Sequence, residues 1–234
     1  PTPGLVRTAS APARAGSYRG LAPATGPAAR RSIVAVSTGR LEAFSDGVLA
    51  IIITIMVLEL KVPHGDGLEA LKPLLPVFLS YVLSFVYVAI YWNNHHHLMH
   101  TVQHVSASIL WATMHLLFWL SLVPFATAWM GENHYAATPT ALYGFILMMA
   151  GIAYWILQQA IIRSHGPDSI LAKAIGTDIK GYASVALYAI AIPLAFYREF
   201  LADAIYLLVA LWWLIPDRRI ERRMEHGGRS VQTP

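Results

Sequence analysis

Six apolar stretches of helix length follow a polar start of the chain and alternate with short polar segments. They cover about residues 41–62, 73–94, 105–130, 139–162, 180–197 and 199–216. Each stretch is long enough to cross the roughly 30 Å hydrocarbon core of a bilayer as a helix. Barrel strands would alternate apolar and polar residues, and runs such as IIITIMVL do not. The pattern predicts an all-α membrane protein with six transmembrane helices per subunit.

The composition agrees with a membrane protein. Of the 234 residues, 56% are hydrophobic and 13% are charged, whereas a soluble domain carries roughly 25% charged residues. These values exclude a disordered chain, a coiled coil and an ordinary soluble enzyme. The sequence contains no cysteine, which excludes disulfides, zinc–thiolate sites, iron–sulfur clusters and thiol catalysis.

Two polar tails flank the apolar region. Residues 1–36 are rich in Ala, Pro, Gly, Ser and Arg and contain no acidic residue. They show no periodic apolar face, so we expect a disordered basic N-terminal tail. Residues 219–234 are also basic and are expected to form a cytosolic C-terminal tail. The predicted six-helix transmembrane domain occupies residues 37–218 between them.

The distribution of positive charge predicts the orientation of the chain. If the N-terminus is cytosolic, 14 of the 17 Lys and Arg residues lie on inner segments and three lie outside. Because Lys and Arg concentrate on the cytoplasmic side of membrane proteins, both termini are predicted to be cytosolic. We therefore expect a multi-pass protein of the cell membrane, with the run DRRIERR at 217–223 anchoring its last helix.

The first apolar helix has two unlike faces. At about 100° per residue, one aliphatic row broken by a single hydroxyl falls within about 60° of Ile51; it comprises Phe44, Gly47, Ile51, Thr54, Ile55 and Leu58. The opposite face carries Glu42, Asp46, Leu49, Ile53 and Met56. An ionisable residue inside a membrane span is costly and needs a partner, so Asp46 is expected to bind donors on another helix.

Donors for Asp46 are available at the end of the second apolar stretch. The run YWNNHHHLMH at 91–100 reaches the same side of the membrane as Asp46 in the predicted topology. Two or three such donors stabilise a buried carboxylate. We expect a polar network that locks the first helix to its neighbours; its candidate members are Trp92, Asn93, His96 and His97.

The histidines also allow a metal centre as an alternative. His96, His100 and His104 are spaced at i, i+4 and i+8, and His115 follows. Membrane di-iron enzymes distribute several histidine boxes over different loops, whereas this chain has one cluster, so no metal site is expected. A pH-sensing role is physically possible because histidine titrates near neutrality.

A motif at the start of the first helix resembles a known family. Arg40, Phe44, Ser45 and Asp46 form the pattern R-x-x-x-F-S-D, which is similar to that of prokaryotic members of the transmembrane protein 175 family of potassium channels. The continuation AIIITIMVLELKVP, the number of spans and the Trp-Asn-Asn-His run are also similar. The chain has no TVGYG-like loop, so an ordinary potassium filter is absent.

This resemblance implies a potassium-permeable homotetramer in the lipid bilayer. The first helix of each subunit would line a central pore, with no re-entrant filter loop, no cofactor other than permeant K⁺ and no nucleic-acid partner. Ile51 would form the constriction and Thr54 a hydroxyl layer for selectivity, with Ile55 and Leu58 as further aliphatic layers. Arg40, Phe44, Ser45 and Asp46, which make up the motif, would pack the first helix against its neighbours.

Two other classes of function remain as alternatives. A proton-coupled secondary transporter would use Asp46 or a histidine as the proton carrier, and a membrane metalloenzyme would bind metal at the histidine cluster. Transporters favour charged residues at mid-membrane, whereas residues 48–58 carry no charge. The sequence therefore favours a channel over a transporter, and either of these over an enzyme.

Overall fold

The computed structural model describes residues 36–175 and 178–215, which form helices and no strands. The predicted all-α class is therefore confirmed over this part of the chain. The two predicted tails fall almost entirely outside the described residues. The elements are α1 (Thr38–Leu58), the 3₁₀ helix η1 (Leu68–Leu74), α2 (Leu75–Met99), α3 (Ala107–Ser121), α4 (Val123–Glu132), α5 (Ala137–His165), α6 (Ile170–Ile175), α7 (Ile179–Ala195) and α8 (Glu199–Leu214).

Four helical stretches are long and apolar enough to cross a membrane. They are Thr38–Leu58, Leu68–Met99, Ala107–Glu132 and Ala137–His165. The fifth predicted span corresponds to α7, a shorter apolar helix of 17 residues, and the sixth corresponds to α8, with 16 residues.

Helix boundaries follow local chemistry. The third apolar stretch is divided into α3 and α4 at Leu122, just before Pro124. Proline lacks a backbone N–H and clashes with the preceding turn, so it begins a helix more readily than it continues one. At the start of α3, the Ser106 hydroxyl accepts a hydrogen bond from the N–H of Ile109 at 3.4 Å. At the start of α7, Asp178 caps Gly181 in the same way at 2.9 Å.

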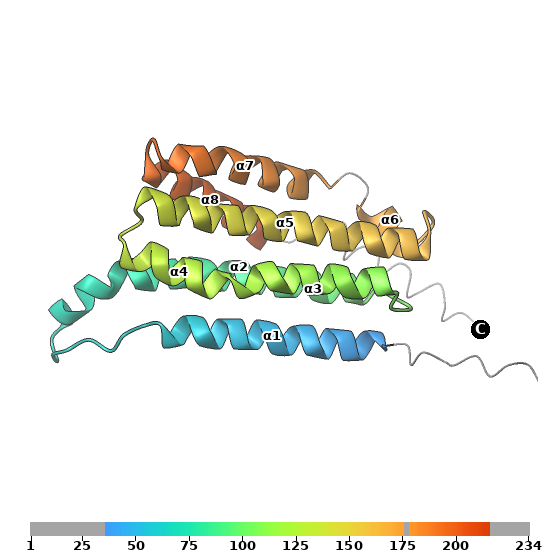
Figure 1. Cartoon of the computed structure of the whole chain (residues 1–234), viewed down its shortest axis with the longest axis horizontal. Coiled ribbons are helices and arrows are strands. Elements are labelled where there is room, and N and C mark those ends of the chain that lie inside the picture. The colour runs from blue at the N-terminus through green and yellow to red at the C-terminus, as the bar shows by residue number, and fades with distance from the viewer. Residues whose placement is uncertain (1–35, 176–177, 216–234) are drawn as a thin grey trace, which may run out of the picture. The chain divides into compact units, whose positions relative to one another are not determined.

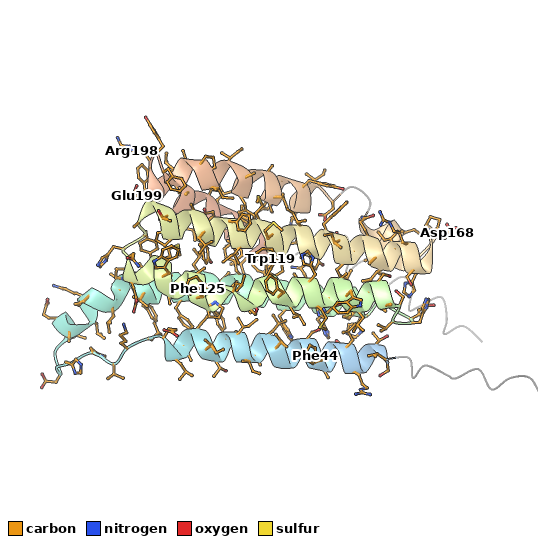
Figure 2. The ribbon with its side chains drawn as sticks, in the orientation of Figure 1. Phe44, Trp119, Phe125, Asp168, Arg198 and Glu199 are labelled. Carbon is orange, nitrogen blue, oxygen red and sulfur yellow. The ribbon has the colours of Figure 1, made fainter. Side chains whose placement is uncertain are left out.

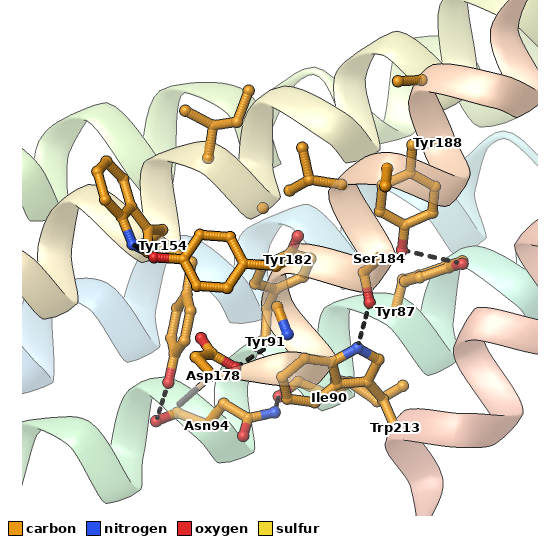
Figure 3. Close-up of a pocket in the computed structure, with 17 residues that line it drawn as sticks. Tyr87, Ile90, Tyr91, Asn94, Tyr154, Asp178, Tyr182, Ser184, Tyr188 and Trp213 are labelled. Atoms are coloured by element: carbon orange, nitrogen blue, oxygen red, sulfur yellow. Dashed lines mark hydrogen bonds between the residues drawn. The ribbon is translucent and has the colours of Figure 1, made fainter. Parts of the chain in front are cut away.

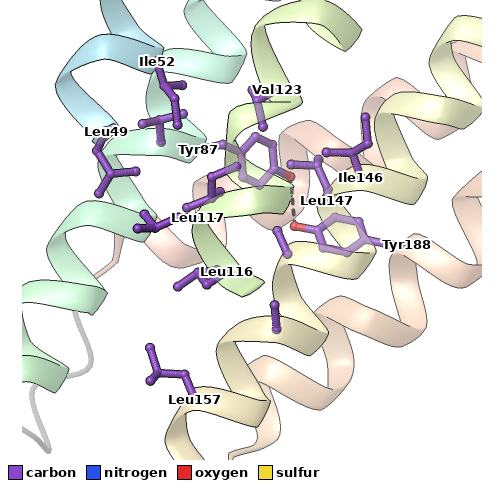
Figure 4. Packing of buried hydrophobic residues seen from close by; sticks show 14 of the residues in the cluster. Leu49, Ile52, Tyr87, Leu116, Leu117, Val123, Ile146, Leu147, Leu157 and Tyr188 are labelled. Carbon is purple, nitrogen blue, oxygen red and sulfur yellow. Dashed lines mark hydrogen bonds between the residues drawn. The ribbon is translucent and has the colours of Figure 1, made fainter. Parts of the chain in front are cut away.

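The helices pack as an antiparallel bundle in which α5 occupies the interior (Figure 1). In this view α1 lies along one side, next to α2, α3 and α4, while α7 and α8 lie on the other side of α5. The buried core is continuous from α1 to α8. Figure 4 shows Leu49 and Ile52 of α1, Leu116 and Leu117 of α3, and Tyr188 of α7 in this packing.

Buried tyrosines satisfy their hydroxyl groups within this core. The Tyr87 hydroxyl donates to the backbone oxygen of Tyr206, and the Tyr206 hydroxyl donates to the backbone oxygen of Thr140 at 3.1 Å. The Tyr188 hydroxyl donates to that of Tyr87 at 3.3 Å. Because an unpaired buried polar group is costly, this chain of hydrogen bonds fixes the register of α2, α5, α7 and α8.

Candidate functional site

The two faces of α1 have opposite environments. Leu49, Ile52 and Met56 are buried against the other helices, each with 2% of its surface exposed. By contrast, Ile51 is 59% exposed and Leu58 is 75% exposed. All six members of the aliphatic row are exposed: Phe44, Gly47, Ile51, Thr54, Ile55 and Leu58. Figure 2 shows side chains that project from α1 on the side away from the other helices.

Thr54 is the single hydroxyl side chain in this exposed row. Its Oγ1 donates a hydrogen bond to the backbone oxygen of Ala50, at 2.9 Å, one turn earlier. A hydroxyl has one hydrogen and two acceptor lone pairs. Because the hydrogen is used within α1, the lone pairs remain available outward, where the oxygen can accept a hydrogen bond or contact a cation.

The motif residues at the start of α1 divide between these faces. Ser45 is fully buried, and its hydroxyl donates to the backbone oxygen of Leu41 at 2.9 Å. Phe44 is 53% exposed. Arg40 is also exposed, and its side chain makes no hydrogen bond or ion pair with the described residues.

Asp46 accepts a hydrogen bond from a side chain of α2. The donor is the indole Nε1 of Trp92, at 3.0 Å from Oδ1. One turn earlier on α1, Glu42 accepts a hydrogen bond from Nδ1 of His96 at 2.9 Å. These two contacts tie adjacent turns of α1 to adjacent turns of α2. Glu42 was not among the predicted members of the network, although it lies one turn before Asp46 on the same face of α1.

The other candidate members of the network contribute less. Asn93 is exposed and makes no side-chain hydrogen bond within residues 36–175 and 178–215. The ring of His97 meets that of His96 edge-on at 5.7 Å. His95, by contrast, is 1% exposed, and neither ring nitrogen has a partner among the described residues. The sequence run HHH gave no means of selecting the buried histidine.

The histidine row does not gather at one place. Because α2 ends at Met99, His104 lies beyond the helix, where Ser164 is 3.4 Å from its Nε2 and the ring of His165 is 4.4 Å from its ring. His115 accepts a hydrogen bond from Trp119 within α3 at 2.9 Å. The spacing i, i+4, i+8 therefore brings together only His96 and His100, whose Nε2 atoms are 3.0 Å apart.

Beyond the opposite end of α1, an ion pair joins Lys61 to Glu132, the last residue of α4. Lys61 donates to Glu132, and this contact raises the pKa of the lysine ammonium. Both side chains are exposed, so the pair contributes little to stability. The exposed aliphatic row lies between these polar contacts and packs against no other helix of the described chain.

A cavity of about 400 Å³ lies on the other side of the bundle, between α2, α5, α7 and α8 (Figure 3). Tyr91, Tyr154 and Tyr182 contribute much of its wall, and Nε1 of Trp213 donates to Ser184 at 2.9 Å. None of its lining residues belongs to α1, so this cavity is distinct from the exposed row.

Comparisons with known proteins identify the family. The sequence model described as the endosomal/lysosomal potassium channel TMEM175 matches residues 40–124. A potassium channel of Chryseobacterium sp. (strain P1-3) is 57% identical over 192 residues, which cover 82% of this chain and all of the relative. The chain belongs to the TMEM175 family.

A solved structure of the TMEM175 family supports the same assignment. The crystal structure of a lysosomal potassium-selective channel TMEM175 homolog from Chamaesiphon minutus matches with a TM-score of 0.65 and 30% identity, and the match covers 76% of this chain and 96% of that one. A potassium channel of Streptomyces collinus is 32% identical over 75% of this chain and 91% of its own length. TMEM175 membership confirms a multi-pass membrane channel rather than an enzyme.

Proposed function

We propose that this chain is the subunit of a passive potassium channel in which copies of α1 line the pore. The observation that carries the proposal is the exposed aliphatic row on α1, which has Ile51 at its middle and is left uncovered by every other described helix. The curated relatives and the solved homolog, which are potassium channels by name, support this reading.

Four copies around a symmetry axis are the proposed assembly. A single α1 offers one apolar stripe, which cannot enclose a path for ions. Identical stripes closed by cyclic symmetry form a ring, and cyclic symmetry is a usual arrangement of homo-oligomers. The contacts of Asp46 with Trp92 and of Glu42 with His96 hold α1 at a fixed angle on its own subunit, so each copy would present the row in the same way.

Ile51 would form the gate of this pore. Four isoleucine side chains around an axis make a short apolar ring, which excludes ions when it dewets and conducts when it widens enough to hold water. Ile55 and Leu58 would add aliphatic layers one and two turns further along α1. These residues are 43% and 75% exposed in the subunit, so they are available for the same ring.

Selectivity would come from Thr54 rather than from a backbone filter. Its hydroxyl oxygen retains acceptor lone pairs beside the exposed row. Potassium would pass partly hydrated, since no cage of carbonyl oxygens replaces its water shell, and conduction would need no resident cofactor. Moderate rather than strict preference for potassium over sodium follows from this arrangement.

The proposed topology has six spans, with both termini in the cytosol and the protein in the cell membrane. The long helices supply four crossings, and α7 and α8 would supply the remaining two. Tilting or local bilayer thinning accommodates helices of 17 and 16 residues at modest cost. An even number of spans would place both termini on one side, and the bias of Lys and Arg favours the cytosol as that side.

Reconstitution tests the function directly. Purified protein is placed in liposomes with an outward potassium gradient, and flux is measured with a fluorescent probe before and after addition of a potassium ionophore. A channel gives passive flux that follows the potassium gradient and persists without a proton gradient. Flux that requires a proton gradient would instead support the proton-coupled transporter.

Native mass spectrometry of the same preparation tests the assembly. A mass of four subunits supports the proposed tetramer. Monomers or dimers alone, in a preparation that conducts potassium, would show that the pore is not built from four copies of α1.

A further inference from the structure

We propose that His96 of α2 and His100, which directly follows the last residue of α2, form with the support of Glu42 of α1 a binding site for a transition-metal ion such as Zn²⁺. One ligand atom from each of the three residues lies within 4.8 Å of the other two. The site lies at the end of the bundle where α1 begins and α2 ends, and none of its members belongs to the exposed aliphatic row. It goes beyond the proposed pore and does not depend on it.

The two ring nitrogens are already at the separation of metal ligands. Nε2 of His96 and Nε2 of His100 are 3.0 Å apart. With Zn–N bonds of about 2.0–2.1 Å and tetrahedral angles, two histidine ligands have nitrogens roughly 3.3 Å apart. Residues four apart on a helix face the same direction, so the end of α2 holds both rings side by side, and rotation of the rings would direct both nitrogens at one ion.

The neighbours of His96 hold its ring in the state that a metal needs. A carboxylate only accepts hydrogen bonds, so Glu42 Oε1 places the proton of His96 on Nδ1, at 2.9 Å. Nε2 of His96 then carries a free lone pair. This is the carboxylate–histidine–metal arrangement, in which the outer carboxylate fixes the tautomer and raises ligand basicity. The indole of Trp92 stacks on the same ring, with 5.9 Å between centroids.

His100 completes the pair from an accessible position. Without metal, Nε2–H of His100 donates to the lone pair of His96. Metal binding requires that the proton of His100 move from Nε2 to Nδ1, the ordinary exchange between the two imidazole tautomers. His100 is exposed, so an ion can reach the site from water. Glu42 and Asp46, on successive turns of α1, supply the negative charge that favours a cation there.

Imidazole ligands select the class of metal. Histidine nitrogen suits Zn²⁺, Cu²⁺, Ni²⁺ and Co²⁺, whereas Mg²⁺ and Ca²⁺ prefer oxygen ligands. Two histidines and a supporting carboxylate leave further coordination positions for water. The expected ion is therefore a divalent transition metal held by two ring nitrogens at the end of α2, and not the potassium that the channel conducts.

The test is titration of the tag-free, purified full chain with Zn²⁺ by calorimetry and with Co²⁺ by visible absorption. The wild type is expected to bind one ion per subunit with a Co²⁺ absorption band. His100→Gln removes a ligand and should abolish both signals. Glu42→Gln should weaken affinity by about 10–100-fold, as loss of an outer carboxylate does. Zn²⁺ should raise the thermal unfolding temperature of the wild type and not that of His100→Gln.

His104→Gln is the matched control, because His104 is a second histidine near the same end of the bundle and lies outside the three-residue cluster. It should bind metal as the wild type does. Wild-type affinity in His100→Gln would overturn the proposal. Loss of binding in His104→Gln with retention in His100→Gln would place the metal at His104 and His165 instead, and would equally overturn it.

Discussion

Helices α1 and α5 are both apolar and long enough to span a bilayer, yet the other helices of the subunit cover much less of α1 than of α5. Twelve of the 29 residues of α5 are buried, and the helix has α3 and α4 on one side and α7 and α8 on the other. Only five of the 21 residues of α1 are buried. The difference lies in which residues face outward. On α1 the exposed residues include the aliphatic row centred on Ile51, which runs along the helix.

This contrast indicates different roles for the two helices in the subunit. A helix enclosed by its own chain, such as α5, has its surroundings fixed when one subunit folds. A helix with one covered and one exposed face, such as α1, has the surroundings of its exposed face fixed only when lipid or another protein surface covers that face. In a bilayer, lipid tails can cover this face without any specificity. They offer no polar partner to the Thr54 hydroxyl and no close packing at Gly47, both of which lie within the row. Substitutions on the two helices should therefore disturb different properties.

The largest effect is expected from an added methyl group on α5. A Cβ at position 144 would lie 2.0 Å from the Tyr206 hydroxyl and 2.7 Å from its ring carbon, and Tyr206 is fully buried. Gly144→Ala should therefore lower the free energy of unfolding by roughly 1–3 kcal/mol, as overpacking does. Thermal unfolding in detergent measures the loss.

Gly47→Ala on α1 is the matched control. A Cβ at position 47 would meet nothing within 4 Å in the subunit, and alanine favours a helix over glycine by about 1 kcal/mol. The unfolding temperature should stay the same or rise. A greater loss of stability in Gly47→Ala than in Gly144→Ala would reverse the comparison between the two helices.

The second effect concerns the open row itself. Ile51→Asn should wet the proposed apolar ring, raise open probability several-fold and weaken discrimination against sodium, because a polar ring no longer excludes water. Single-channel recording in bilayers measures both quantities. Ala50→Ser is the control, because Ala50 is exposed beside the row and its substitution changes polarity without changing the ring. Met56→Asn would not serve, because Met56 is buried. An Ile51→Asn channel with unaltered gating and ion preference would place the constriction elsewhere.

Sequence periodicity predicted much of this arrangement, and its failures have physical reasons. The 100° spacing of residues separated the exposed from the buried side of α1 because that helix packs on one face only. The third predicted span is divided into α3 and α4 just before Pro124, a break that the apolar pattern alone did not indicate. The partner of His96 was missed because contacts between Glu42 and α2 depend on how two helices cross. Similarly, the row His96, His100 and His104 required α2 to continue past Met99, where it ends.

A smaller effect is expected at the contact between α1 and α2. Asp46→Ala and Trp92→Phe should each lower stability by about 1 kcal/mol, since the bond involves a charged acceptor but is partly exposed. The double variant should lose no more than either single one, because both remove the same hydrogen bond. Full additivity of the two losses in a thermal unfolding cycle would show that the contact contributes nothing.

Arg40→Ala separates assembly from folding in the same motif. Because Arg40 has no side-chain partner among the described residues, its removal should leave the unfolding temperature of the subunit unchanged. In the proposed assembly Arg40 would pack α1 against its neighbours, so the yield of tetramer by native mass spectrometry should fall. Unchanged tetramer yield together with a lower unfolding temperature would assign Arg40 to the subunit and not to the assembly.

The smallest effect is expected at Thr54. Thr54→Ala removes an oxygen whose hydrogen is already donated to Ala50, so the helix itself loses little. What disappears is a set of acceptor lone pairs beside the exposed row. In the proposed pore, four such oxygens contact partly hydrated potassium, and their loss should reduce the potassium-to-sodium permeability ratio a few-fold while open probability stays near that of the wild type. Thr54→Ser keeps the oxygen and should retain the ratio. Reversal potentials under bi-ionic conditions measure it, and equal ratios in Thr54→Ala and Thr54→Ser would show that the hydroxyl does not select the ion.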